Sequence, residues 1–342
     1  MKQKIKKRLI QTIEYLFFLG LGIGLLWLSF YKLDYSEVKK DILSADYHWL
    51  FIALFFAIVS HIFRALRWNM LINAMGYKTR VSTTFFAVMI GYLANTAVPR
   101  MGEFMRCGVL SKKEKIPFNS LFGTVISERL FDLLMLALIM FFVIIFQLDK
   151  VGAYVSDIFS PLMNSLFSNL SSILILLGSI ILFFAISIWF VWRSREWIKS
   201  FRLYNKVRGF IDGLMEGIKT IMKLEKKWLF IIYTLLIWLF YAIMVYMPVL
   251  MLKDTAHLNF VDALTILAIG SLGIVAPVPG GIGAYHFIVK SILVELYSVE
   301  ANAAGSFAAI THAGQTLLNV IVGSLSYFYM MVITKSQKAS NE

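Results

Sequence analysis

Long apolar runs separated by short charged segments dominate the chain. A helix that crosses a bilayer needs about 20 mostly apolar residues. Runs of that length predict full transmembrane helices at residues 9–30, 49–72, 118–146, 172–192, 229–252 and 303–333. The first run is too long for the apolar part of a signal peptide, and no small-residue cleavage motif follows it, so we expect an uncleaved first span.

Two further apolar regions are interrupted near their middle by proline and glycine. Region 82–110 contains AVPRMGE at 97–103, and region 260–297 contains APVPGGIG at 276–283. Backbone that leaves a helix within a bilayer is tolerated only where protein buries it or water reaches it. We therefore interpret each region as a re-entrant hairpin, in which two half-helices return to the membrane side from which they entered.

Basic residues give the predicted orientation. With the N-terminus inside, the inner segments hold 24 of the Lys and Arg residues, the outer loops hold five and the apolar segments hold four. Such a bias follows the positive-inside rule. We expect a multi-pass protein of the cell membrane with both termini in the cytoplasm. A basic amphipathic segment at about 196–228 would then be cytoplasmic, either lying on the inner leaflet or packed on the protein as a connector.

Each half of the predicted topology holds three crossings and one hairpin. Because three is odd, the halves, about 1–146 and about 172–333, insert in opposite directions. We therefore expect an all-α polytopic membrane protein, one integral membrane domain over 1–342, with six full spans, two re-entrant hairpins and an inverted 3+3 repeat. In secondary transporters, such repeats bring broken helices together near the bilayer midplane.

Composition agrees with a chain embedded in lipid. Hydrophobic residues make up 59% of the sequence and charged residues 15%, whereas soluble domains have roughly half and a quarter. Cys107 is the single cysteine, which excludes an internal disulfide. The net charge of +13 reflects membrane orientation and not nucleic-acid binding. The sequence has no Walker loop, zinc motif or nucleophile elbow, so we expect no cofactor, no metal and no catalytic residue.

Charged residues inside the apolar regions are the clearest functional signal, because a charge at the bilayer centre costs about 2.5–3.5 kcal/mol. In the first hairpin, the N-terminus of the returning half-helix favours an anion such as phosphate. Glu128 and Asp132 are four residues apart on one helix face near the predicted midplane. The candidate substrate-binding residues of this half are Arg64, Arg67, Asn95, Arg100, Glu103, Arg106, Glu128, Arg129 and Asp132.

Each of these groups also has a purely structural interpretation. The charged residues of the first hairpin can pair with one another and hold the hairpin shut. Glu128 and Asp132 can form a fixed buried network with Arg100, Arg106 or Arg129 instead of lining a polar path. Arg64 and Arg67 can extend to the inner headgroups instead of gripping the phosphate of a lipid.

In the second hairpin, successive N–H groups of the glycine-rich break form a candidate phosphate nest. The candidate residues here are Gly280, Gly281, Gly283, His286 and Lys290. In the last span, His312, Gln315 and Asn319 share one helix face. They either line the cavity or hydrogen-bond between helices.

Four motifs, in this order, resemble the lysylphosphatidylglycerol synthase transmembrane region, the flippase-like domain of MprF-type proteins. They are R-x-L-R-W at 64–68, N-x-x-x-P-R-x-G-E-x-x-R at 95–106, E-R-L-x-D at 128–132 and P-x-P-G-G-I-G at 277–283. The resemblance covers nearly the whole chain and implies a lipid-translocase-like fold with re-entrant helices. In MprF-type proteins this domain moves aminoacylated phosphatidylglycerol outward, and a separate cytosolic domain makes that lipid. The sequence shows no such synthase domain, so aminoacyl transfer is not expected.

We therefore expect a flippase or transporter for an anionic or phosphate-bearing lipid, such as a phospholipid, an aminoacyl lipid or a lipid-linked sugar. The alternative is a membrane glycosyl or lipid transferase that uses a polyprenyl-phosphate donor, with Asp34, Glu37 and Asp41 as available outer carboxylates. A third interpretation is a non-transporting accessory subunit of such an enzyme. The expected partners are a lipid with an anionic headgroup, a second copy of the chain or a lipid-synthesising enzyme, and not nucleic acid.

Overall fold

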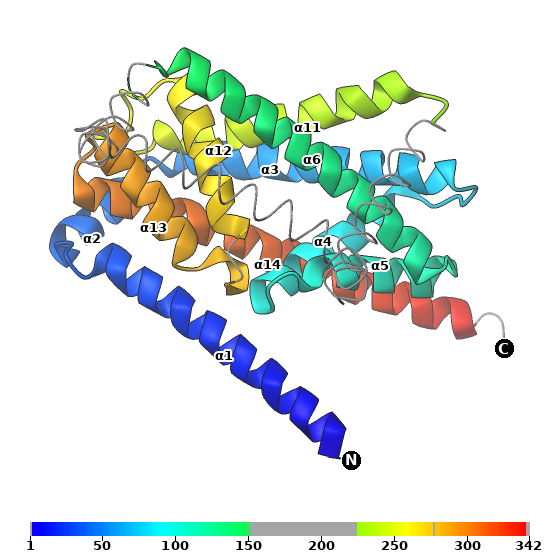
Figure 1. Cartoon of the computed structure of the whole chain (residues 1–342). Helices are drawn as coiled ribbons and strands as arrows, with labels where there is room; N and C mark the ends of the chain where they lie inside the picture. Colours follow the sequence, from blue (N-terminus) through cyan, green and yellow to red (C-terminus); the bar gives the residue numbers. More distant parts are fainter. Residues whose placement is uncertain (1, 149, 151–223, 276–277, 340–342) are drawn as a thin grey trace, which may run out of the picture.

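The computed structural model describes residues 2–148, 150, 224–275 and 278–339. Within these ranges the chain forms helices joined by short loops, and no strand is present (Figure 1). The first half contains α1 (Lys2–Phe30), α2 (Tyr35–Ser44), α3 (Tyr47–Ala74), α4 (Val81–Ala97), α5 (Met101–Glu114) and α6 (Phe118–Phe146). The second half contains α11 (Lys227–Val249), α12 (Phe260–Val275), the 3-10 turn η1 (Pro279–Gly281), α13 (Ala284–Ser291), the π-turn η2 (Ile292–Leu296) and α14 (Ala301–Ala339).

Within the described ranges, four helices are long and apolar enough to cross a membrane. They are α3, α6, α11 and the Ala301–Val332 part of α14. The pair Tyr15–Phe30 and Tyr35–Ser44, bent by 91°, adds a fifth if it counts as one span. An all-helical chain with several apolar helices is thus confirmed, while the count of six spans and the inverted repeat stay predictions. The predicted span 172–192 and the amphipathic segment 196–228 lie outside the described residues.

Both interrupted apolar regions break at their proline and glycine residues. α4 ends at Ala97 and α5 begins at Met101, and Arg100 between them has a left-handed backbone with φ of 60°. In the second region, glycines 280, 281 and 283 all have positive φ. α4 has 17 residues and α12 has 16, fewer than the ~20 that a full crossing needs. These lengths fit half-helices, and the return of each to its side of entry stays a prediction.

Glycine allows α5 to fold back against α4. A Cβ on Gly102 would meet the carbonyl oxygen of Gly91 and the side chain of Asn95, and a Cβ on Gly91 would lie 2.9 Å from the Gly102 carbonyl oxygen. The two helices therefore touch backbone to backbone. Asn95 Oδ1 accepts a hydrogen bond from the Gly102 N–H at 2.6 Å, which satisfies one of the free amides at the start of α5.

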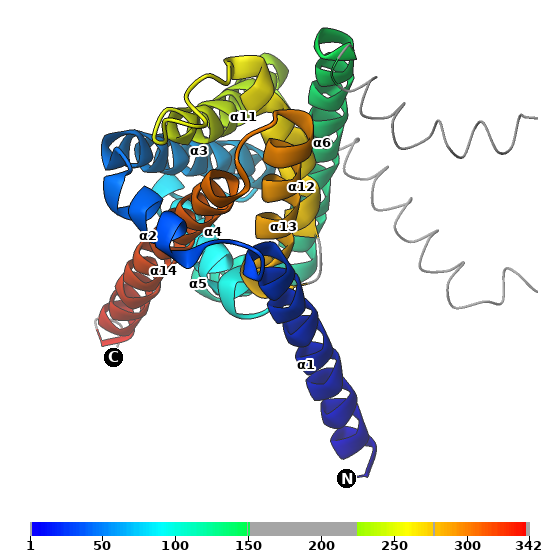
Figure 2. The same ribbon diagram turned by 90° about the vertical axis from the view of Figure 1, so that its left-hand side faces the viewer.

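The two breaks lie against each other. A Cβ on Gly280 in η1 would be 3.5 Å from the carbonyl oxygen of Thr96, in the last turn of α4. α1 contacts both breaks, because the Tyr15 hydroxyl donates to the Ala97 carbonyl at 3.4 Å and Gly22 packs against the second break near Val278. Figures 1 and 2 show that the N-terminal half of α1 stands away from the other helices. α1 thus contacts the place where the two breaks meet.

Candidate functional site

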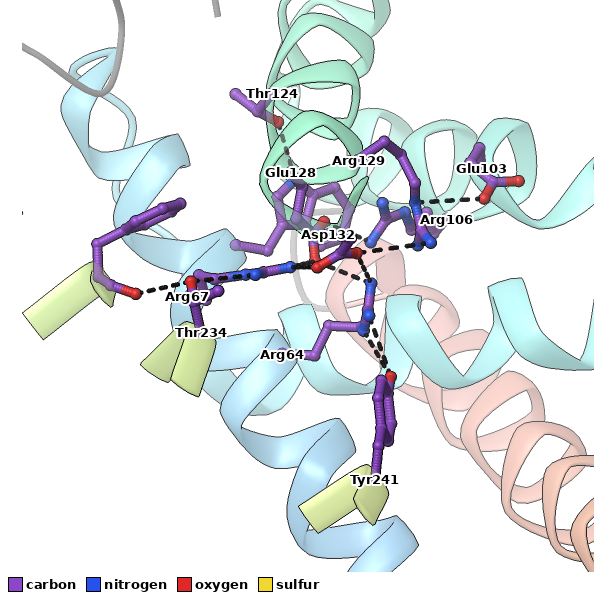
Figure 3. Close-up of polar contacts among 12 residues, drawn as sticks. Arg64, Arg67, Glu103, Arg106, Thr124, Glu128, Arg129, Asp132, Thr234 and Tyr241 are labelled. Carbon is purple, nitrogen blue, oxygen red and sulfur yellow. Dashed lines mark hydrogen bonds and ion pairs between the residues drawn. The ribbon is translucent and has the colours of Figure 1, made fainter. Parts of the chain in front are cut away.

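Three arginines and two carboxylates meet between α3, α5 and α6 (Figure 3). We call Arg64, Arg67, Arg106, Glu128 and Asp132 the arginine–carboxylate cluster. All five are buried: counted over the whole residue, Arg67 and Glu128 are 0% exposed and none of the five exceeds 8%. Buried charges of this kind are tolerated only when they are paired and hydrogen-bonded. The cluster is therefore held by its internal contacts.

Arg64 and Arg67 each bind both carboxylates. Glu128 Oε1 accepts from Arg64 Nη1 at 3.2 Å and from Arg67 Nη2 at 3.1 Å. Asp132 accepts from Arg64 Nη1 at 3.1 Å and from Arg67 Nη2 at 2.7 Å. The spacings of three residues on α3 and four residues on α6 place each pair on one helix face. Four arginine–carboxylate contacts thus join α3 to α6.

Arg106 of α5 belongs to the same cluster. Its Nη1 lies 2.9 Å from Glu128 Oε2, but the contact lacks the angle of a hydrogen bond and is an ion pair only. The guanidinium also lies over the ring of Trp68, 4.7 Å from the centroid. Its other terminal nitrogen, Nη2, is buried and has no hydrogen-bond partner. Arg106 therefore keeps unused donor capacity inside the protein.

Polar side chains of α11 complete the cluster from the second half of the chain. The Tyr241 hydroxyl accepts from Arg64 Nε at 3.2 Å and from Nη2 at 3.0 Å. Thr234 Oγ1 accepts from Arg67 Nη1 at 3.1 Å. The sequence analysis missed both, because one hydroxyl in an apolar span has no local pattern that points to an arginine 177 or 167 residues away.

Arg129 and Glu103 form a looser rim. Arg129 Nε lies 3.6 Å from Glu103 Oε1, and its Nη1 lies 3.6 Å from Asp132 Oδ2. The Arg129 side chain is 46% exposed, whereas the arginines of the cluster are buried. Cluster and rim together set four arginines against three carboxylates, so this constellation has one surplus positive charge.

A small pocket opens beside the surplus charge. Its volume is about 20 Å³, which is enough for a water molecule. Its lining comes from Arg64, Val88, Gly91, Tyr92, Asn95, Gly102, Glu103, Arg106 and Arg129. Three arginines and the closely packed residues of α4 and α5 thus line the same pocket.

The structure corrects two interpretations from the sequence. Arg64 and Arg67 do not extend to the headgroups, because they are buried and bound to Glu128 and Asp132. Nor do the charged residues of the first hairpin simply pair with one another, since Arg106 binds a carboxylate of α6. Arg100 is exposed in the turn between α4 and α5. A buried network with arginines is present, but most of its contacts come from Arg64 and Arg67 of α3, and of the three predicted partners only Arg106 is buried in it.

The candidate residues of the second hairpin lie apart from the cluster. Over residues 278–283, its glycine-rich break does not present a row of free amides. The N–H groups of Gly281, Ile282 and Gly283 are bonded to Val278, Pro279 and His286, respectively. Lys290 Nζ donates to the Ser29 carbonyl of α1 at 2.7 Å, which ties the returning helix to the first span.

The polar face of the last span makes contacts within the protein. His312 Nε2 lies 2.9 Å from the Gly280 carbonyl oxygen, and Gln315 Nε2 donates to Met244 S at 3.1 Å. Asn319 Oδ1 is buried with no hydrogen-bond partner. The first two residues therefore fit the hydrogen-bonding interpretation of this face.

The outer carboxylates have structural contacts of their own. Asp34 caps α2 by accepting from the Ser36 N–H at 2.8 Å, and Asp41 accepts from the Ser306 hydroxyl at 3.0 Å. Glu37 pairs with Lys40 on the surface. Within the described part of the chain, no group of three or more His, Cys, Asp or Glu residues is arranged to hold a metal ion.

Comparison with known proteins gives a family and two partial relatives. The family model described as lysylphosphatidylglycerol synthase TM region matches residues 15–323. A UPF0104 membrane protein of Methanocaldococcus jannaschii is 29% identical over 136 residues, which are 39% of this chain and 38% of that protein. The glycosyltransferase AglD of Haloferax volcanii is 28% identical over 134 residues, 39% of this chain and 22% of that protein. Both alignments thus cover less than half of the relative, and no solved structure matches.

Proposed function

The chain belongs to the family of lysylphosphatidylglycerol synthase TM regions, and from that premise we propose that it moves an anionic or phosphate-bearing lipid between the leaflets of the cell membrane. The headgroup would pass the arginine–carboxylate cluster while the acyl chains stay in the bilayer. The lipid classes that fit are a phospholipid, an aminoacyl lipid and a lipid-linked sugar. Both termini would lie in the cytoplasm, as the distribution of basic residues predicts.

The surplus positive charge beside a small pocket is the observation that carries this proposal. A buried charge without a counter-charge is unfavourable, and an anion that binds there removes the imbalance. At an effective dielectric constant of about 20, opposite charges about 4 Å apart attract by roughly 4 kcal/mol. Arg106 also has a buried donor, Nη2, without a hydrogen-bond partner, and a phosphate oxygen is a strong acceptor for it.

The pocket is too small for a lipid headgroup, so the described conformation is closed in the proposed cycle. Opening requires α5 to separate from α4 or α6, because the pocket lies between these helices. The Arg106–Glu128 ion pair joins α5 to α6, and a headgroup phosphate that binds Arg106 would replace Glu128 as its partner. Partner exchange of this kind keeps every buried charge compensated during movement.

Reconstituted vesicles with fluorescent lipids test this function. The protein should speed the exchange of an anionic lipid between leaflets more than that of a neutral glycolipid with the same acyl chains. Vesicles without protein measure the spontaneous rate. Equal rates for both lipids, or no acceleration of either, would count against the proposal.

The partial likeness to a protein named as a glycosyltransferase favours a second candidate function. In that case the chain would be a membrane glycosyl or lipid transferase, or an accessory subunit of one. Asp34 and Asp41 are engaged in structural hydrogen bonds, so these outer carboxylates form no assembled site within the described residues. Incubation of the purified protein with labelled lipid-linked sugars, followed by product detection, separates the two functions. A glycosylated product would favour the transferase.

A further inference from the structure

Two histidines hold the tip of the second hairpin, apart from the arginine–carboxylate cluster. His312 of α14 places Nε2 2.9 Å from the carbonyl oxygen of Gly280. His286 of α13 accepts a hydrogen bond at Nδ1 from the N–H of Gly283, at 3.3 Å. The two ring centroids are 4.6 Å apart, and His286 is 7% exposed while His312 is half-buried. The rings therefore form one shielded pair.

The partners of the two rings limit where the protons can be. A carbonyl oxygen only accepts, so His312 Nε2 carries a proton. Its Nδ1 lies 3.5 Å from the Thr316 hydroxyl, which can donate to a lone pair or accept from a proton. An amide N–H only donates, so His286 Nδ1 carries the lone pair and its Nε2 carries the proton. The bond from Gly283 thus keeps His286 neutral, whereas the contacts of His312 fit a neutral and a charged ring equally.

The two rings differ in their capacity to take a second proton. On His286 that proton would attach to Nδ1 and break the hydrogen bond from Gly283. On His312 it would attach to Nδ1 and leave the bond to Gly280 intact, because the Thr316 hydroxyl can turn and accept. Two charged rings 4.6 Å apart would repel each other, so one proton excludes a second. The pair can thus bind one additional proton, on His312.

Aromatic and small residues pack around this pair. α1 presents Phe30, whose ring is 5.8 Å from that of His286, and α12 presents Gly273 to α13. The Tyr285 ring lies 5.4 Å from the His312 ring, and its hydroxyl contacts Thr311 of α14. Ionisable groups on the surrounding elements include Lys290 on α13, which donates to the Ser29 carbonyl, and Asp262 at the start of α12, which binds Gln147 and Lys150. Further groups are Glu295 in η2, Lys32 after α1, Glu300 before α14, and Asp41 on α2, which accepts from Ser306 of α14. A charge on His312 would therefore act mainly on its own hydrogen bond to Gly280.

That hydrogen bond lies where the two hairpins meet, because Gly280 packs against Thr96 at the end of α4. A charge-assisted hydrogen bond is about twice as strong as a neutral one. We propose that His312, paired with His286, is a proton-binding site whose protonation holds the second hairpin tip against the first and so slows the lipid movement. Only the effect on lipid movement rests on the proposed function, and proton binding can be measured without it.

Nuclear magnetic resonance of labelled imidazole nitrogens tests proton binding. The chain has five histidines, which single substitutions can assign. His286→Asn keeps an acceptor for Gly283, and His312→Gln keeps a donor for Gly280, but neither new side chain titrates. On acidification from about pH 8 to pH 4, His312 should gain one proton at Nδ1 in the natural protein and in His286→Asn. A proton that appears on His286 instead, or on neither ring, would overturn the inference.

Lipid exchange in vesicles tests the consequence. In the natural protein, exchange should slow on acidification with the slope of one proton, roughly tenfold per pH unit at its steepest. His312→Gln should remove this dependence, and His286→Asn should retain it. Exchange that is independent of pH in the natural protein, or unchanged in its pH dependence in His312→Gln, would contradict the inference. Absence of exchange at every pH would contradict the proposed function, and the resonance titration would then decide on the proton site.

Discussion

Arg67 Nη2 donates to Asp132 Oδ1 at 2.7 Å, the shortest contact in the arginine–carboxylate cluster. The Arg67 side chain is 0% exposed and that of Asp132 is 11% exposed. Removal of one partner from a buried ion pair leaves a charge that neither water nor protein compensates, at a cost of about 3–5 kcal/mol. The pair is therefore a sensitive point for the stability of the whole helix assembly.

Asp132→Ala should lower the free energy of unfolding by about 3–5 kcal/mol, because Arg67 and Arg64 each lose a carboxylate partner. Glu37→Ala is the control, since it breaks the exposed pair with Lys40, and it should leave stability unchanged within error. Unfolding in detergent, followed by circular dichroism, measures both. Equal stability of the two variants would show that the buried ion pairs contribute nothing to the free energy of unfolding.

Gly102→Ala should separate α4 from α5, because the added Cβ meets the Gly91 carbonyl oxygen and Asn95. We expect a loss of about 1–3 kcal/mol in unfolding free energy, as for an overpacked core. Gly108→Ala on the same helix is the matched control. Its Cβ meets nothing within 4 Å, so the higher helix propensity of alanine should stabilise the protein by about 0.5–1 kcal/mol. If Gly102→Ala were as stable as Gly108→Ala, the close helix contact would not constrain the fold.

Lys112→Cys should be labelled from the cytoplasmic side if the first interrupted region returns to its side of entry. Replacement of buried Cys107 by alanine first removes the native thiol. A thiol reagent that cannot cross the membrane should then fail to label intact cells and should succeed after permeabilisation. Glu37→Cys in the predicted outer segment should show the opposite pattern. External labelling at position 112 would mean that this region crosses the membrane completely.

The Tyr241 hydroxyl accepts two hydrogen bonds from Arg64. Tyr241→Phe should therefore destabilise the protein by about 1–3 kcal/mol, because it leaves buried donors of a charged group unsatisfied. Thermal unfolding of this variant beside Tyr233→Phe, whose ring packs on Phe63, measures the difference. A smaller loss for Tyr241→Phe than for Tyr233→Phe would contradict the assignment.

Local sequence patterns predicted where helices run and where they break. Apolar length predicted α3, α6, α11 and α14, and proline with glycine predicted both breaks. The charged residues in α3, α5 and α6 stood out because charge in an apolar run is costly. α2 was not predicted, since residues 35–44 are short, polar and without the length of a span.

Contacts between distant segments could not be predicted from the sequence, because they depend on tertiary packing. Arg64 points inward because Tyr241 of α11 and the carboxylates bind it there, so it does not extend outward to the headgroups. The occupied amides of the second hairpin depend in the same way on the bond between Gly283 and His286, and on turn geometry that composition does not reveal.

Substitution of Arg106 tests the central claim most directly, namely that the buried surplus of positive charge receives the headgroup of the lipid. The measurement is the rate of anionic-lipid exchange in vesicles for Arg106→Gln and for Lys112→Gln, which removes a charge from the exposed end of the same helix. Thermal unfolding must first show that both variants, like the natural protein, remain folded at the temperature of the assay. The account predicts that Arg106→Gln loses most of the exchange, by roughly tenfold or more for one charge-assisted hydrogen bond, while Lys112→Gln retains it. Exchange by Arg106→Gln at the rate of the natural protein would contradict the account.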